Sequence, residues 1–142
     1  RNCITIENDE NKWGIEHSLE LEKDLALVLD IHHHWCNTRG EYIEPTDDRF
    51  KRIIDSWRGV RPAMHYSVSR KDLLQGHATD VKPDYKQLLE QGYKKAKLRA
   101  HSDLMWNTAV NEWAGTFRKD FDIMVEAKSK NLASIPFEES TN

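Results

Sequence analysis

Residues 25–31 read Leu-Ala-Leu-Val-Leu-Asp-Ile and form an apolar run of about the length of one β-strand. Polar and apolar side chains do not alternate along this run, so both faces of the strand are expected to be buried. Strands buried on both faces are typical of parallel sheets that carry helices on each side. The run therefore predicts an α/β protein.

Strands and helices are expected to alternate on both sides of this run. Three further strands are predicted, at residues 3–7, 60–66 and 121–126. The predicted helices are 15–23, 45–58, 84–97 with an interruption at Gly92, 103–117 and 127–133. Four strand–helix units in succession favour a parallel sheet with right-handed crossovers. Residues 71–100 are expected to form a long loop and helix excursion after the third strand.

Composition and charge narrow the class of protein. A chain of 142 residues with 38% hydrophobic residues fits one domain with a core, which excludes disordered and fibrous classes. The longest apolar run is too short to span a membrane, so we expect a soluble intracellular protein. With a net charge of -3, any DNA binding must be local. Cys3 and Cys36 are expected to be free, packed thiols, and the start at Arg1 suggests a piece of a longer polypeptide.

Each of the four expected strands ends with a side chain that can bind a metal ion. These side chains are Glu7, Asp30 with His33 just beyond it, His65 and Glu126. The carboxyl ends of parallel strands meet at one rim, so the five side chains are expected to converge. Each of these side chains, considered alone, could equally be a solvent-exposed or structural residue. Their common position at the ends of successive strands is what favours a functional site. Mixed carboxylates and imidazoles suit Mn²⁺, Zn²⁺ or Fe²⁺, so the sequence predicts a transition-metal site.

Five motifs, in this order, resemble the C-terminal half of the UV damage endonucleases, the UvdE or UvsE family. They are Ile6-Glu-Asn-Asp9, Leu29-Asp-Ile-His-His-His34, Met64-His-Tyr-Ser67, Arg99-Ala-His-Ser-Asp103 and Asp122-Ile-Met-Val-Glu-Ala-Lys128. The family lies in the TIM-barrel superfamily that also holds xylose isomerase and metal-dependent apurinic endonucleases. The resemblance implies that residues 1–142 are a single partial domain, the C-terminal half of a TIM (β/α)8 barrel.

The resemblance also implies an activity and a set of metal ligands. It implies a nuclease that binds damaged double-stranded DNA and cuts the phosphodiester just 5′ of a UV photolesion with metal-activated water. Up to three divalent ions, most often Mn²⁺, are expected, and the residues that match family ligands are Glu7, Asp30, His33, His65, His101 and Glu126. The family has a carboxylated, metal-bridging lysine where this chain has Ala63, so a third metal lacks its usual bridge.

Partners and compartment follow from the same resemblance. A half-barrel leaves two sheet edges open, so we expect it to pair with a missing N-terminal half-barrel or with a second copy. No membrane partner is expected, and the compartment would be the cytoplasm in a bacterium or virus-infected cell, or the nucleus in a fungus.

Basic and aromatic residues near the rim are candidates for contact with DNA. Lys94, Lys95, Lys97 and Arg99 fall within six positions, just before His101. We expect Lys97 and Arg99, together with Lys128, to contact phosphates, and a solvated helix face is an equal alternative for this basic run. Of the tryptophans, only Trp35 is a candidate for stacking on a base.

Two alternative functions stay open. One is a metal-dependent apurinic endonuclease or sugar isomerase of the same superfamily, although the Asp-x-His-His-His block argues against an isomerase. The other is a non-catalytic or degenerate half-barrel module, which Ala63 and the missing half would explain.

Overall fold

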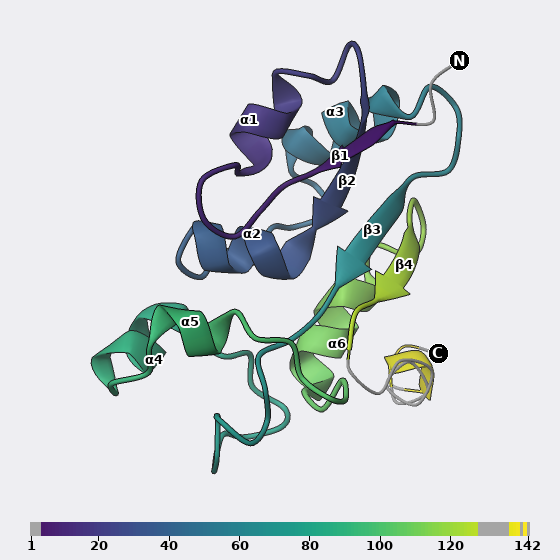
Figure 1. The fold of residues 1–142 in the computed structure, drawn as a ribbon. Coiled ribbons are helices and arrows are strands. Elements are labelled where there is room, and N and C mark those ends of the chain that lie inside the picture. Colours follow the sequence, from purple (N-terminus) through teal and green to yellow (C-terminus); the bar gives the residue numbers. More distant parts are fainter. Residues whose placement is uncertain (1–3, 128–136, 140, 142) are drawn as a thin grey trace.

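Four parallel strands form one sheet in the computed structural model, which describes residues 4–127, 137–139 and 141 (Figure 1). The strands are β1 (Thr5–Glu7), β2 (Ala26–Asp30), β3 (Ala63–Tyr66) and β4 (Asp122–Val125). They lie side by side in chain order, and each pairs with the next in parallel. This order, with helices between the strands, is that of a segment of a TIM barrel. The predicted α/β class is confirmed, and the open sheet agrees with half of a barrel.

Helices fill the connections between successive strands. They are α1 (Ile15–Leu19), α2 (Ile31–Asn37), α3 (Asp48–Ser56), α4 (Tyr85–Glu90), α5 (Lys95–Leu98) and α6 (Thr108–Gly115). The main core lies between the sheet and helices α1, α3 and α6. Leu29 and Met64 of the strands are each at most 1% exposed, and Phe50 of α3 stacks on Phe117 at 4.8 Å. None of the helices in the described ranges is long and apolar enough to cross a membrane.

Several element boundaries differ from those expected from the sequence. The strand expected to reach Ile31 ends at Asp30, and the next residue begins α2, which was not predicted. The helix expected from residue 103 begins at Thr108, because the side chain of Asn107 caps it by accepting a hydrogen bond from Val110 N at 2.9 Å. Leu104 is therefore outside the helix and 43% exposed. The first predicted helix, expected to reach residue 23, ends at Leu19 and continues only as turns.

Two predictions fall wholly or partly on residues that the structure leaves undescribed. The predicted helix 127–133 lies outside the described residues except for Ala127, which is not helical. Cys3 also lies outside them, whereas Cys36 is a buried free thiol as expected.

The excursion at residues 71–100 packs on a second hydrophobic cluster against α2. It carries α4 and α5, with the predicted interruption around Gly92, whose φ is 95° (Figure 1). Tyr85 of α4 meets Trp35 of α2 edge to face, with ring centroids 4.9 Å apart. Gly40, at φ 114°, lies so close to Tyr85 that a Cβ on Gly40 would be 2.9 Å from the Tyr85 Cβ. Trp35 is thus 3% exposed, and the expectation that it could stack on a base is wrong.

Candidate metal centre

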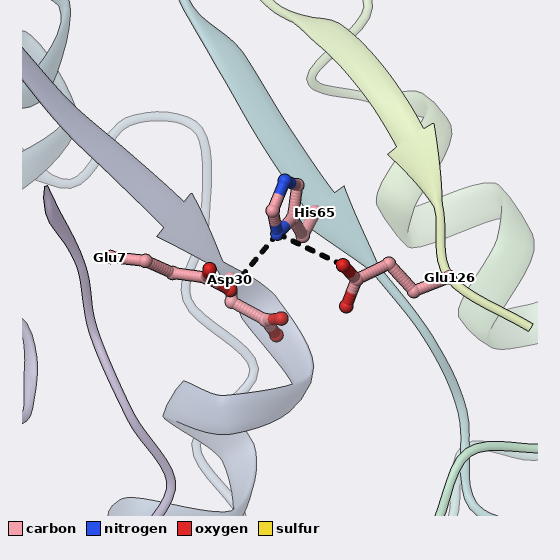
Figure 2. Close-up of side chains that lie close together, drawn as sticks. All are labelled: Glu7, Asp30, His65 and Glu126. Atoms are coloured by element: carbon pink, nitrogen blue, oxygen red, sulfur yellow. Dashed lines mark hydrogen bonds and ion pairs between the residues drawn. The ribbon is translucent and has the colours of Figure 1, made fainter. Parts of the chain in front are cut away.

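The ends of the four strands bring four metal-binding side chains to one place. Glu7 and Asp30 are the last residues of β1 and β2, His65 lies in β3, and Glu126 directly follows β4. Pairing aligns them: Asp30 is the register partner of His65, and Glu126 N donates to Tyr66 O at 2.8 Å, which extends the ladder past β4. Figure 2 shows the four side chains pointing toward one another.

The distances within this group fit a metal-binding cluster. His65 Nδ1 lies 2.9 Å from Glu7 Oε1 and 3.3 Å from Glu126 Oε1 (Figure 2). One potential ligand atom from each of the four residues lies within 4.8 Å of all the others. Two ligands on opposite sides of an ion with bonds of ~2.2 Å are ~4.4 Å apart, so small side-chain movements suffice to bind one.

Asp30 has one carboxylate oxygen that the fold leaves without a hydrogen bond. Its Oδ1 caps α2 by accepting from the backbone N–H groups of His32 and His33 at 2.9 and 2.8 Å. Its Oδ2 is buried and accepts no hydrogen bond from the described residues. A buried carboxylate oxygen without a hydrogen bond lowers the stability of the fold unless a cation binds it. This atom is therefore suited to be a metal ligand.

The pKa shifts reflect three carboxylates crowded around one imidazole. Burial raises the pKa of Asp30 to about 7, an effect that the charge of His33 opposes and that of Glu7 reinforces. Burial also acts to raise the Glu7 pKa and is the largest single effect there, but the hydrogen bond with His65 and the contributions of Asp30 and His33 together outweigh it, so the Glu7 pKa is lowered. That same hydrogen bond raises the pKa of His65. The cluster thus favours a positive charge at its centre, which fits a divalent cation.

The other two predicted ligands lie beside this group. His33 Nδ1 is 3.5 Å from Glu7 Oε1 and 3.4 Å from Asp30 Oδ2, and it donates to the carbonyl oxygen of Asn8 at 2.8 Å. The His101 ring centroid lies 6.4 Å from that of His33. Burial lowers the pKa of His101, and the nearby Glu126 carboxylate opposes this shift. His33 thus borders the cluster at Glu7 and Asp30, and His101 lies beside the His33 ring and near Glu126.

Of the three residues predicted to contact DNA, two lie on the described surface and the third lies outside the described residues. Lys97 lies exposed in α5, and Arg99 is exposed at the end of that helix, where its Nη1 donates to Asn11 Oδ1 at 3.3 Å. Lys128 lies outside the described residues. Ala63, at the start of β3, is two residues before His65 and so belongs to the same side of the strand.

Two residues at the centre were given no role by the sequence analysis. Asn8 is 1% exposed, and its side chain accepts from Asp30 N and donates to Asp30 O, both at 2.9 Å. Glu10 Oε2 lies 3.6 Å from His33 Nε2. Asn8 follows Glu7 inside a quoted motif, and its position next to a strand-end ligand was the one available signal.

Comparisons with known proteins agree with the motifs. The family model described as UV-endonuclease UvdE matches residues 1–139. A curated UV DNA damage endonuclease of Bacillus cereus (strain ATCC 10987 / NRS 248) is 23% identical over 141 residues, covering 94% of this chain. The corresponding protein of Bacillus mycoides (strain KBAB4) is 24% identical over 139 residues, covering 93%. The chain spans 36% of the length of both relatives. No solved structure matches it significantly.

Proposed function

Because the chain belongs to the UV-endonuclease UvdE family, we propose that it carries the metal centre of a DNA repair endonuclease that cuts just 5′ of UV photolesions. The observation that carries this proposal is the convergence of Glu7, Asp30, His65 and Glu126 within 4.8 Å of one another. The names of the curated relatives support the substrate class, damaged DNA. A DNA repair activity acts on cellular DNA, so we propose that the protein works inside the cell.

The chemistry of the donor set supports a divalent transition metal, of which we propose Mn²⁺. Three carboxylates and an imidazole combine the oxygen and nitrogen ligands that such ions accept. Divalent ions at this rim would lower the pKa of an attacking water and neutralise the leaving oxygen of a phosphodiester. We propose Glu7, Asp30, His65 and Glu126 as the central ligands, with His33 and His101 completing the set around further ions. Ala63 stands where the family has a metal-bridging lysine, so a third ion would lack that bridge.

The protein's own side chains prepare this chemistry. Asp30 is fixed by its bonds to the N-terminus of α2, so its free oxygen is held in place before any ligand arrives. His33 is oriented by donating from Nδ1 to the Asn8 carbonyl oxygen, which leaves Nε2 as the nitrogen able to accept a cation. Glu126 and Glu7 flank His65 on opposite sides and hold it between them.

Incision of a UV-irradiated, 5′-labelled duplex in the presence of Mn²⁺ tests the proposal. We expect a cut just 5′ of the lesion, no cut in an undamaged duplex, and a rate at least ~100-fold lower for Glu126→Gln, which removes a charged ligand but keeps its shape. Calorimetric titration with Mn²⁺ should show weaker binding in the same variant. A folded chain that binds Mn²⁺ but leaves the damaged duplex intact would contradict the proposal and favour a non-catalytic module.

A further inference from the structure

A groove of about 330 Å³ lies beside the metal centre and is lined by three separate parts of the chain. The loop after β1 contributes Glu10 to Lys12, the end of α2 contributes Asn37 and Arg39, and the excursion contributes Tyr85, Lys95 and Arg99. The Gly40–Tyr85 contact and the Trp35–Tyr85 ring pair hold the last two parts together. The groove is therefore part of a packed framework and not a gap between loose loops.

Four cations, Lys12, Arg39, Lys95 and Arg99, line this groove, and all four side chains are exposed. Glu10 is the one acidic residue among its lining residues. Within the described ranges none of the four cations forms an ion pair. By contrast, each of five other arginines pairs with a carboxylate: Arg49, Arg52, Arg61, Arg70 and Arg118. The groove therefore gathers positive charge that the fold does not neutralise, which is the electrostatic footprint of an anionic partner.

The backbone of Arg39 gives an independent reason to assign its side chain a role outside the fold. Arg39 follows the end of α2 with φ 60°, a left-handed conformation that favours glycine. Arg58 adopts the same conformation after α3, at φ 51°, but its guanidinium donates to Lys23 O. Arg39 has no such partner among the described residues, so a strained position carries an arginine whose side chain forms no hydrogen bond or ion pair there.

The groove connects directly to the metal centre. Glu10, at its edge, lies 3.6 Å from His33, and His33 lies 3.5 Å from Glu7. A nucleic-acid strand with a phosphate at the centre would therefore place its neighbouring phosphates over the groove. Side chains that contact only phosphates position the strand without reading its sequence.

We propose that the groove formed by Lys12, Arg39, Lys95 and Arg99 binds the phosphate backbone of the DNA strand that the metal centre cuts. This inference rests on the proposed function and deepens it, because it assigns the side of the centre along which the strand runs. Lys97, although in the same basic run of the sequence, does not line the groove and is not part of this assignment.

Binding of a UV-irradiated duplex without added divalent metal, followed by fluorescence anisotropy between 50 and 200 mM salt, tests the groove. Replacing Arg39 with glycine (Arg39→Gly) removes one cation and relieves the left-handed conformation, so the thermal midpoint should not fall. We expect affinity near 100 mM salt to drop about 5- to 10-fold, and the slope of log K against log salt to decrease by ~0.9. The double variant Lys95→Gln/Arg99→Gln should decrease the slope by ~1.8.

Arg58→Gly is the matched control, because it has the same backbone conformation and charge change but lies in the loop that enters β3, at the opposite end of the strands. Its affinity and slope should equal those of the unaltered chain. If the unaltered chain cuts damaged DNA while the groove variants keep its slope, the groove assignment is wrong and the proposed function stands. If the unaltered chain neither binds nor cuts damaged DNA, the proposed function itself fails.

Discussion

Asn8 connects two residues of the candidate metal centre although it has no charge of its own. Its side chain closes two hydrogen bonds with the backbone of Asp30, and its carbonyl oxygen accepts from His33 Nδ1. It thus ties the end of β1 to the end of β2 and orients one of the neighbouring imidazoles. Loss of a group that orients a ligand in this way typically lowers metal affinity about 10- to 100-fold.

Replacing Asn8 with alanine (Asn8→Ala) tests this role. The variant leaves the buried N–H of Asp30 without its partner, at a cost of ~1–3 kcal/mol, and removes one of the hydrogen bonds that the Asp30 carbonyl oxygen accepts. We expect the free energy of unfolding in urea to fall by about 2 kcal/mol or more, and Mn²⁺ affinity to fall about 10-fold or more. Asn11→Ala, at an exposed position, should change stability by less than about 0.5 kcal/mol. Equal effects of the two variants would show that Asn8 has no special role.

The apolar pattern of the sequence explains which residues of the candidate site could be predicted. Glu7, Asp30, His65 and Glu126 were found because each ends an apolar run, and parallel pairing alone brings such ends together. Asn8 and Glu10 were missed because their roles depend on hydrogen bonds and side-chain distances across 22 and 23 positions of the chain, which no local pattern records.

The boundary between β2 and α2 is one that the apolar pattern does not predict. Ile31 follows Asp30 as a further apolar residue, so the apolar pattern does not mark the end of β2. The boundary is set by the side chain of Asp30, which turns back to cap the next helix. The presence of all four strands was predicted, because each contains an apolar run.

Asp47 allows a test of helix capping and its pH dependence in α3. Its side chain accepts from Arg49 N at 2.9 Å as the N-cap, and its hydrogen bonds with the Arg49 side chain keep the Asp47 pKa below 3.8. A carboxyl whose pKa is lower in the folded than in the unfolded state stabilises the fold above the unfolded value. That stability is lost as the pH falls through the folded pKa. We therefore expect Asp47→Ala to lower the free energy of unfolding by about 1 kcal/mol at pH 7.

Denaturant unfolding at several pH values checks this expectation. The difference between Asp47→Ala and the unaltered chain should shrink as the pH falls below 3.8, because the carboxyl then binds a proton in the unfolded state while it stays ionised in the folded state. The difference should level off only below the folded pKa, where the carboxyl is protonated in both states. Asp48→Ala, one position along, removes an acid from the first turn but not the cap, so we expect a loss of only ~0.3–0.5 kcal/mol. A difference for Asp47→Ala that is as large at pH 3 as at pH 7 would contradict the capping account.

The whole molecule presents an open sheet. Within the described residues, β1 and β4 each have a neighbour on one side only, and their outer edges carry unpaired backbone groups. Apolar side chains lie exposed at both, with Ile4 at 59% and Met124 at 54% exposure. A closed barrel of this superfamily has eight strands, and the chain covers about a third of its relatives' length. These edges are where further strands would pair.

We therefore predict that the chain associates through the edges of β1 and β4, either with the remaining part of a barrel or with a second copy. Light scattering over a range of concentrations should show a mass above that of one chain, which decreases on dilution. Met124→Lys places a charge on β4 and should shift this equilibrium toward the monomer. Val60→Lys makes the same change at a position that is 65% exposed but lies before β3, so it should leave association unchanged. A cooperatively folded monomer at every concentration would mean that the edges are stable without a partner.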